Sequence, residues 1–373
     1  MKFRAAVLGS PGEPLTIETV EAMPLRPTDV LVKIAAVGLC HTDLEVIEGQ
    51  LKYPMPIVLG HEAAGTIEEV GDAVSKERRG ERVVLSWNPH CGRCFHCSRD
   101  QPILCERYVG LGPQAVPFDG MMRLRLGAGE LRTMFYIAGF AEYAIVNDMC
   151  AVSVPKEMPL DRACLIGCGV MTGVGAALNF SGLSYGDSAM VIGCGAVGLS
   201  AIQGARLAGA SNIVGVDRSW DRLELARVVG ATHVVKVPDD DALTRMRDLT
   251  GGRGADCVLE SAGNNAAFRL SVEVCRTGGR VVWLGKTGIN DEVAFRWGSL
   301  MGEKRIVRSS YGGARPARDF PRLAQAYLDG KLLLDEYITR RIRLEDINQG
   351  FDDLRQGRGV RSVVSFDSIA GLS

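Results

Sequence analysis

Four cysteines in the first third of the chain have the spacing of a metal site. Cys91, Cys94, Cys97 and Cys105 follow the pattern C-x2-C-x2-C-x7-C. Four thiolates with this spacing can close a tetrahedron around Zn²⁺, with zinc–sulfur bonds of about 2.3 Å. Because sulfur then takes all four positions, none remains for a substrate, and the pattern indicates a structural zinc. An iron–sulfur site or unrelated free thiols remain as alternatives.

The quartet also bears on the redox environment of the chain. Eleven cysteines are many for 373 residues, and clustered cysteines in a cytosolic chain indicate metal before disulfides. His90 and His96 lie beside and within the quartet. Either is a spare ligand at most, since four sulfurs suffice, and we predict that both are loop residues.

A glycine motif between two apolar stretches has the spacing that dinucleotide-binding proteins use. Gly193, Gly195 and Gly198 form G-x-G-x-x-G directly after an apolar run that indicates a buried parallel strand. The first glycine permits a tight turn, the second lets the backbone approach a pyrophosphate, and the third lets helix and strand pack closely. The helix that follows presents free N–H groups to the phosphates.

An acidic residue completes this dinucleotide signature. Asp217 directly follows the next predicted strand, 24 residues after Gly193, where a carboxylate accepts the adenosine ribose hydroxyls. A carboxylate there repels a 2′-phosphate and so favours NAD over NADP. Arg218 and Arg222 follow closely and weaken that preference slightly. Arg222 is therefore kept among the coenzyme-binding candidates, with plain surface solvation as the alternative.

The elements that position this motif alternate between strand and helix. Candidate strands and helices share the stretch 173–310; the strands are 189–192, 213–216, 233–235, 257–260 and 280–284, and the helices include 220–229 and 264–275. Alternation of this kind predicts a doubly wound parallel sheet of the α/β class.

The two ends of the chain differ from this middle stretch. Short apolar runs separated by Gly and Pro predict antiparallel strands at 5–8, 29–37, 64–70, 82–85 and 140–146. Thr42 or Asp43 is predicted to cap a short helix. Residues 110–139 are predicted to form a long surface loop. Towards the C-terminus the pattern predicts helices near 319–329 and 344–356 and a last strand at 361–366.

Length and composition limit the classes of protein. A chain of 373 residues suggests two domains. With a net charge of −1, nothing indicates a general affinity for nucleic acid or anionic membranes. The N-terminal apolar run is too short for a signal peptide, and no uninterrupted apolar segment is long enough to span a bilayer. These absences favour a cytoplasmic protein.

Five motifs along the chain resemble those of one enzyme family. Their order and spacing are similar to those of the zinc-dependent medium-chain alcohol dehydrogenases; the motifs are Cys40-His-Thr-Asp, Gly60-His-Glu, the cysteine quartet, Gly167-Cys-Gly-Val-Met-Thr-Gly and Gly193-Cys-Gly-Ala-Val-Gly. The resemblance covers essentially the whole chain. It implies a mostly-β, GroES-like catalytic domain, residues 1–172 and 311–373, around a Rossmann coenzyme domain, residues 173–310. It also implies a homodimer or homotetramer.

The same resemblance implies a second, catalytic zinc. Its ligands would be Cys40, His61 and Cys168, which taken singly are more often buried core residues than ligands. Two cysteines, one histidine and an open fourth position suit a catalytic zinc. The implied chemistry is hydride transfer between NAD and an alcohol or aldehyde whose oxygen the zinc polarises.

Four residues around these ligands match positions with roles in the family. Thr42 would take the alcohol proton, Asp43 would orient His61, and Glu62 is the acidic neighbour that can approach the metal. Some members place a proton-relaying histidine five residues after the first cysteine ligand, where this chain has Glu45. The relay then ends on the ribose hydroxyls, on Glu45 or on water, and these alternatives stay open.

Four more residues match coenzyme-binding positions. His41 and Arg361 correspond to basic residues near the pyrophosphate, and Thr172 and Val197 correspond to residues that pack against the nicotinamide. The alternative for all four is an ordinary place in the core or on the surface.

The substrate cleft is indicated only by similarity of position. Leu51, Trp87, Met134 and Phe135 match lining residues, although each could equally be core. Together they suggest an apolar pocket for aromatic or medium-chain aliphatic primary alcohols and aldehydes. Glutathione-dependent formaldehyde dehydrogenases place acids near the position of Leu51; here the segment 49–52 is Gly-Gln-Leu-Lys, so that activity ranks second.

The sequence leaves two alternatives from other classes of protein. In the first, the quartet is a zinc finger in a nucleic-acid-binding protein, which the near-zero net charge and the lack of a basic stripe oppose. In the second, the protein senses NAD without turnover, which the complete ligand set and Thr42 oppose. The expected partner is therefore a small-molecule alcohol or aldehyde, without nucleic acid or membrane.

Overall fold

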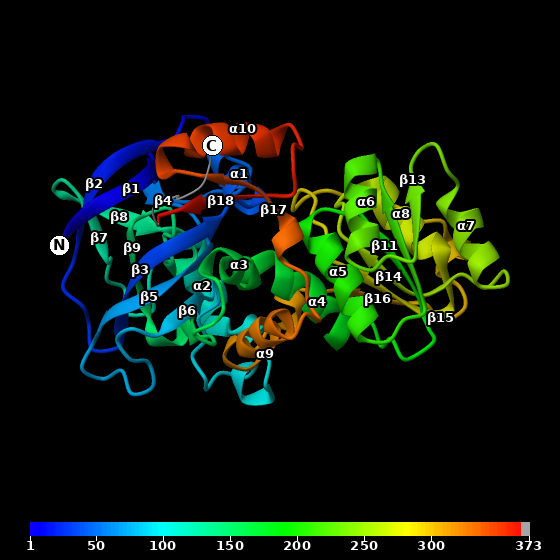
Figure 1. Ribbon diagram of the computed structural model, residues 1–373, viewed down its shortest axis with the longest axis horizontal. Coiled ribbons are helices and arrows are strands. Elements are labelled where there is room, and N and C mark those ends of the chain that lie inside the picture. Colours follow the sequence, from blue (N-terminus) through cyan, green and yellow to red (C-terminus); the bar gives the residue numbers. More distant parts are fainter. Residues whose placement is uncertain (367–373) are drawn as a thin grey trace. The chain divides into compact units, whose positions relative to one another are not determined.

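The computed structural model describes residues 1–366 (Figure 1). The chain divides into two compact units, one made of Met1–Cys168 and Arg315–Ser373 and the other of Gly169–Ala314. The predicted domain boundaries, 172/173 and 310/311, each lie four residues from these divisions. Residues 367–373, which the prediction assigned to the first domain, lie outside the described part.

The second unit, Gly169–Ala314, contains a six-stranded parallel sheet. Its strands in spatial order are β13 (His233–Lys236), β12 (Asn212–Asp217), β11 (Ser188–Ile192), β14 (Ala255–Glu260), β15 (Cys275–Trp283) and β16 (Arg305–Arg308). The order runs outward from β11 in both directions. The carboxyl ends of β11 and β14 therefore flank the point where the strand order reverses, which is where open α/β sheets bind ligands.

Helices connect these parallel strands, as the alternation predicted. The connections are α5 (Ala196–Leu207), α6 (Trp220–Val228), α7 (Ala242–Leu249) and α8 (Asn265–Val274), and α4 (Met171–Asn179) precedes β11. Met190, Val214 and Val258 are fully buried in the core of this unit. The predicted doubly wound sheet is confirmed. Helix α7 was not predicted, because it buries only Ala242 and Met246 among charged residues.

In the first unit, five strands form a small closed barrel. They are β1 (Lys2–Leu8), β2 (Thr16–Ala22), β7 (Leu124–Leu126), β8 (Gly129–Thr133) and β4 (Ile57–Val58). The prediction of a surface loop at 110–139 was wrong, because β7 and β8 form a hairpin in this barrel. Leu124 and Leu131 point into its core and are almost fully buried. Only two or three residues of each strand alternate, too few for the pattern to stand out among Gly and Arg.

The larger sheet of the first unit carries the candidate catalytic metal site, whose predicted ligands are Cys40, His61 and Cys168. Its order is β10 (Ala151–Ser153), β6 (Arg82–Leu85), β5 (Glu62–Val70), β3 (Asp29–Gly38), β18 (Arg361–Ser365) and β17 (Ile338–Ile342), and β9 (Tyr143–Asn147) also pairs with β3. Central strand β3 is buried at nine of its ten residues. The helices of this unit are α1 (His41–Ile47), α2 (Glu106–Leu111), α3 (Leu160–Leu165), α9 (Pro316–Leu328) and α10 (Ile347–Arg355).

One helical run of the described chain is long and apolar enough to cross a membrane by length and composition. It is Leu160–Asn179, and 72% of its most apolar window is buried inside the structure. Burial of that extent is what a core helix shows. The expectation that no apolar segment reaches this length is thereby corrected.

Candidate metal and coenzyme sites

Three antiparallel neighbours bring distant parts of the sequence to one sheet edge. At the end of β3, Gly38 lies opposite Glu62 of β5 and opposite Val363 of β18. Cys40 follows β3 by two residues, His61 directly precedes β5, and Arg361 begins β18. The register of these strands therefore places all three side chains at the same edge.

Cys168 reaches this edge from a helix. It lies in a π-helical turn, Ile166–Val170, that follows α3; such wide turns occur often at functional sites. The preceding residue must be small, because a Cβ on Gly167 would lie 2.9 Å from the carbonyl oxygen of Leu85 in β6. Glycine thus lets the turn approach the sheet and brings Cys168 to the other candidate ligands.

The four donor side chains lie close enough to share one ion. Ligand atoms of Cys40, His61, Glu62 and Cys168 all lie within 4.8 Å of one another. Glu62 is fully buried; its Oε1 accepts a hydrogen bond of 3.0 Å from Arg361, whereas its Oε2 has no partner within residues 1–366. Two sulfurs, a nitrogen and an orphaned carboxylate oxygen form a donor set that fits Zn²⁺.

Asp43 orients the histidine of this cluster. Its fully buried carboxylate lies 3.1 Å from His61 Nδ1 and accepts hydrogen bonds from the backbone N–H groups of Gly60 and Cys40. The bond to Nδ1 leaves Nε2 as the ring nitrogen free to bind a metal. The predicted helix cap was wrong in detail: Cys40 is the N-cap of α1, and Asp43 sits at the third helical position and reaches back to it.

Charge in the cluster favours a cation. Burial raises the pKa of Glu62 to about 8, although Arg361 opposes this shift. The hydrogen bond with Cys168 holds the pKa of the Cys40 thiol well below its usual range. The Arg361 guanidinium lies 3.0 Å from Glu62 and 3.9 Å from the Cys40 sulfur. The single positive charge of Arg361 thus faces several groups that can carry a negative charge. A divalent cation would balance the negative charge that Arg361 leaves unpaired.

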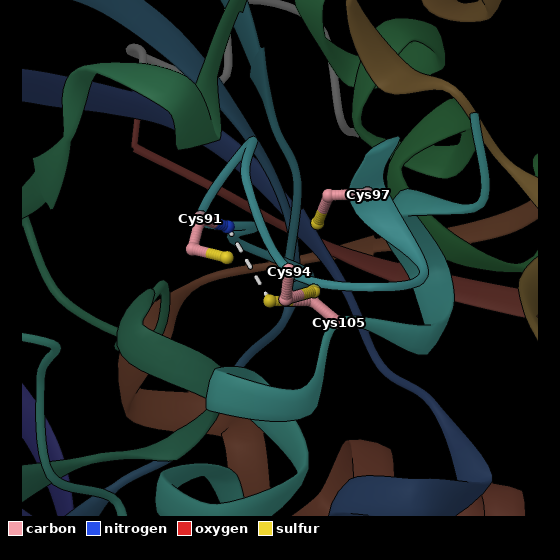
Figure 2. Close-up of side chains that lie close together, drawn as sticks. All are labelled: Cys91, Cys94, Cys97 and Cys105. Atoms are coloured by element: carbon pink, nitrogen blue, oxygen red, sulfur yellow. Dashed lines mark hydrogen bonds between the residues drawn. The ribbon is translucent and has the colours of Figure 1, made fainter. Parts of the chain in front are cut away.

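The cysteine quartet forms a second, separate cluster. Figure 2 shows the side chains of Cys91, Cys94, Cys97 and Cys105 gathered together. Their sulfur atoms all lie within 4.8 Å of one another. In a tetrahedral zinc site the sulfurs lie about 3.8 Å apart, given zinc–sulfur bonds of about 2.3 Å. Two short 3₁₀ turns, Cys97–Arg99 and Pro102–Leu104, fold the segment back, and the Cys91 backbone N–H donates to the Cys105 sulfur at 3.3 Å. The four-sulfur set fits a structural zinc.

The quartet gives a testable expectation about stability. Cys94→Ser should lower the zinc content from two ions per chain to one and lower the thermal unfolding temperature, since a structural zinc contributes folding free energy directly. His96→Ala is the matched control, because His96 is half-buried and its ring contacts Gln101 and Phe95 rather than the four sulfurs within residues 1–366. Elemental analysis and calorimetry measure both variants; loss of zinc in His96→Ala would show that the histidine is a ligand.

An aromatic group lies beside the first cluster. The Phe135 ring centroid lies 5.4 Å from that of His61, 5.1 Å from that of Trp87 and 6.1 Å from that of Tyr53. Tyr53 was missed, because a lone tyrosine between Lys52 and Pro54 gives no pattern. Leu51 is half-buried and packs against the hydrophobic core of the first unit. Met134 is fully buried within that core and lies outside this aromatic group.

Helix α1 carries three more predicted site residues. His41 is exposed, and Thr42 and Glu45 are half-buried, all within one to five residues of Cys40. The structure therefore places them on the element that begins at the candidate metal ligand. Their roles toward coenzyme, alcohol proton and relay stay predictions.

The glycine motif forms a tight turn in the second unit. Gly193 has φ of +89°, and a Cβ there would lie 2.9 Å from the backbone nitrogen of Ala262. A Cβ on Gly198 would lie only 1.7 Å from the carbonyl oxygen of Gly193. Beside Gly195, in contrast, the described chain leaves open space, and this residue caps the N-terminus of α5 without a side chain. The arrangement fits a cradle for phosphate.

Asp217 is held against this cradle. One carboxylate oxygen accepts from the backbone N–H of Cys194 at 2.7 Å, and the other accepts from those of Arg218 and Ser219. Arg222 lies half-buried on α6. The carboxylate is thus fixed at the end of β12, beside the open space at Gly195.

The two residues predicted to contact the nicotinamide lie on touching helices. Thr172 belongs to α4 and Val197 to α5. A Cβ on the intervening Gly173 would lie 2.2 Å from the Val197 carbonyl oxygen, so the two helices meet at this point.

Sequence reasoning missed one buried acid in this unit. Glu260 ends β14 beside β11, and its Oε1 accepts from the backbone N–H groups of Ala262 and Gly263. Burial raises its pKa. The carboxyl group holds the loop that packs on the glycine turn. The sequence feature that could have identified Glu260 is an acidic residue at the end of an apolar strand.

The fold and these sites define a class of protein: a two-unit dehydrogenase with a dinucleotide-type sheet and zinc-type cysteine and histidine clusters. Residues 26–156 match the alcohol dehydrogenase GroES-like domain family, and residues 196–329 match the zinc-binding dehydrogenase family. The chain belongs to the zinc-dependent medium-chain alcohol dehydrogenases. The resemblance of its motifs is thus confirmed.

Individual relatives cover nearly the whole chain. The NDMA-dependent alcohol dehydrogenase of Amycolatopsis methanolica is 37% identical over 98% of this chain and 99% of its own length. The S-(hydroxymethyl)glutathione dehydrogenase of Komagataella pastoris is 35% identical over 98% of both chains. The crystal structure of benzyl alcohol dehydrogenase from Acinetobacter calcoaceticus is 31% identical, covers 98% of this chain and 99% of its own, and has a TM-score of 0.93. The protein is therefore an alcohol dehydrogenase-type oxidoreductase, and its substrate and coenzyme are matters for proposal.

Proposed function

We propose that the protein interconverts primary alcohols and aldehydes, aromatic or medium-chain aliphatic, with NAD(H) as the coenzyme. The observation that carries this proposal is the convergence of Cys40, His61 and Cys168 at one sheet edge, within reach of a single ion. The rings of Phe135 and Trp87 lie beside that cluster. They supply an apolar surface next to the reacting position.

The chain's residues have distinct tasks in this reaction. Cys40, His61 and Cys168 would hold a Zn²⁺, which supplies Lewis-acid polarisation of the substrate oxygen when bound. Asp43 fixes the histidine ring. Glu62 keeps a free carboxylate oxygen next to the ligands, and Thr42 would take the alcohol proton and pass it toward the coenzyme ribose, Glu45 or solvent.

The coenzyme has its own set of residues. The pyrophosphate would lie over Gly195 at the start of α5, where the space beside the backbone is open. Asp217 would accept the ribose hydroxyls, His41 and Arg361 would contribute positive charge, and Thr172 and Val197 would pack against the nicotinamide. We also propose Arg222 as a neighbour of the adenosine.

The carboxylate of Asp217 sets the choice between the two coenzymes. Asp217→Asn removes the charge while it keeps an oxygen that can accept from the Cys194 backbone N–H. We expect the ratio of kcat/KM for NAD to that for NADP to fall about tenfold, since a repulsion of about 1.4 kcal/mol is removed. Initial rates of reduced-nicotinamide formation with each coenzyme measure the ratio. An unchanged ratio would contradict this role.

A second candidate activity is the oxidation of S-hydroxymethylglutathione, because a curated relative carries out that reaction by name. The segment 49–52 offers no acid to read a charged thiol adduct, so we rank this activity below benzyl alcohol oxidation. A panel of alcohols and aldehydes tests the order, with zinc counted per chain. A higher kcat/KM for S-hydroxymethylglutathione than for benzyl alcohol would reverse it.

We also propose a cytoplasmic homodimer or homotetramer, as in the family. Light scattering of the purified protein gives its mass in solution. The mass of a single 40.1 kDa chain would contradict the proposal.

A further inference from the structure

A cavity of about 440 Å³ lies in the first unit, and none of the residues of the two ligand clusters lines it. Its lining includes the apolar side chains of Phe118, Ile145, Met149 and Cys150. This volume lies within the range of about 300–1,000 Å³ that small-molecule sites occupy, and such sites are mostly apolar with a few polar groups. None of the proposed catalytic or coenzyme-binding residues lines it.

One polar group in this cavity lacks a partner. Tyr136 lines the cavity and is only 6% exposed, and its buried hydroxyl makes no hydrogen bond to any described residue. Buried hydroxyls are normally satisfied by protein or by an ordered ligand or water. The ring itself is well held, with edge contacts to Tyr108 and Phe118 at centroid distances of 5.9 and 6.0 Å.

The backbone keeps this ring apart from the aromatic group at the first metal cluster. Phe135 and Tyr136 both have positive φ, +50° and +65°, a conformation that residues with side chains adopt only when the surroundings impose it. Phe135 contacts His61, Trp87 and Tyr53, whereas Tyr136 contacts a different set of rings and the cavity. The two neighbouring side chains thus lie in different ring groups, which meet where Tyr108 contacts Trp87.

The charges around the cavity balance. Its lining contains two cations and two anions: Arg107, Arg123, Asp119 and Asp148. Arg123 is already bonded to Asp119 and Asp29, and Arg107 donates to the Phe118 carbonyl oxygen. The lining therefore carries no net charge that would favour a charged ligand.

We propose that this cavity is a second small-molecule site, which binds an uncharged aromatic compound whose oxygen accepts a hydrogen bond from the Tyr136 hydroxyl. The apolar lining takes the ring, and the tyrosine fixes its orientation. The site lies beyond the proposed alcohol dehydrogenase reaction and does not depend on it.

Methyl benzoate is a suitable probe, because it has an aromatic ring and an acceptor oxygen but no alcohol or aldehyde to turn over. Its binding to the zinc-loaded protein is measured by calorimetry and located in soaked crystals. Tyr136→Phe removes only the hydroxyl and should raise the Kd about tenfold, in line with the loss of one hydrogen bond. Tyr53→Phe makes the same change beside Phe135 and should leave the Kd unchanged.

The outcomes separate the possibilities. Electron density for the ester at the Tyr136 hydroxyl, together with the tenfold loss in Tyr136→Phe alone, supports the site. No binding, ordered water alone at the hydroxyl, or binding that Tyr53→Phe weakens and Tyr136→Phe does not would overturn it. Unfolding temperatures of both variants show that the fold is retained.

Discussion

Replacing Cys168 by alanine should lower kcat/KM for benzyl alcohol at least about 10³-fold and the zinc content from two ions per chain to one. The sulfur of Cys168 lies within 4.8 Å of the ligand atoms of Cys40 and His61, and its removal leaves too few donors to hold zinc firmly. A loss of about 4 kcal/mol in transition-state stabilisation corresponds to this factor and is a typical contribution of a metal that polarises a substrate oxygen.

Cys164→Ala is the matched control for this substitution. Cys164 lies one helical turn earlier, is fully buried and lies outside the ligand set, and its thiol donates to the Asp161 carbonyl oxygen. We expect this variant to keep two zinc ions and nearly full activity. Elemental analysis, steady-state kinetics and circular dichroism compare the two; full activity in Cys168→Ala would refute the ligand assignment.

Replacing Gly198 by alanine should have the second large effect, on coenzyme binding. The new methyl group would lie 1.7 Å from the Gly193 carbonyl oxygen, well inside van der Waals contact, so the turn and α5 must separate. We expect the Kd for NADH to rise at least about 100-fold, equivalent to about 2.7 kcal/mol, and the unfolding temperature to fall. Fluorescence titration and calorimetry measure these changes.

Gly195→Ala makes the same addition three residues earlier and separates strain from coenzyme contact. The backbone of Gly195 has φ of −74°, which alanine adopts freely, and its Cβ would meet open space. The unfolding temperature should therefore stay unchanged, whereas a pyrophosphate over this residue predicts a Kd for NADH about tenfold higher. An unaltered Kd in this variant would place the phosphates elsewhere.

The sequence alone determined features that depend on neighbouring residues. Strands β11 and β12 were predicted within one residue at each end, because a strand buried on both faces is an unbroken apolar run. The need for glycine at positions 193 and 198 could also be predicted from the sequence, because the spacing of the glycine motif defines the turn. The cysteine quartet lies within 15 residues, so its grouping also follows from local spacing.

Tertiary structure decided what depends on pairing across long distances. Cys40 and Cys168 are 128 residues apart in the sequence, and only strand register and the close approach of Gly167 to β6 bring them together. The ion pair of Glu62 with Arg361 spans 299 positions and follows from the placement of β18 against β3. No periodicity in either segment encodes such a pairing, and in the sequence only the resemblance to a family links these residues.

The hairpin β7–β8 and the cavity lined by Tyr136 likewise could not be predicted from local sequence patterns. Strands β7 and β8 have only three and five residues, and they are placed by pairing with the distant strands β2 and β4 rather than by their own pattern. The sequence therefore determined the elements and the kinds of chemistry, because these depend on local spacing. The tertiary structure decided which side chains share a site, because only the packing of distant strands brings them within bonding distance.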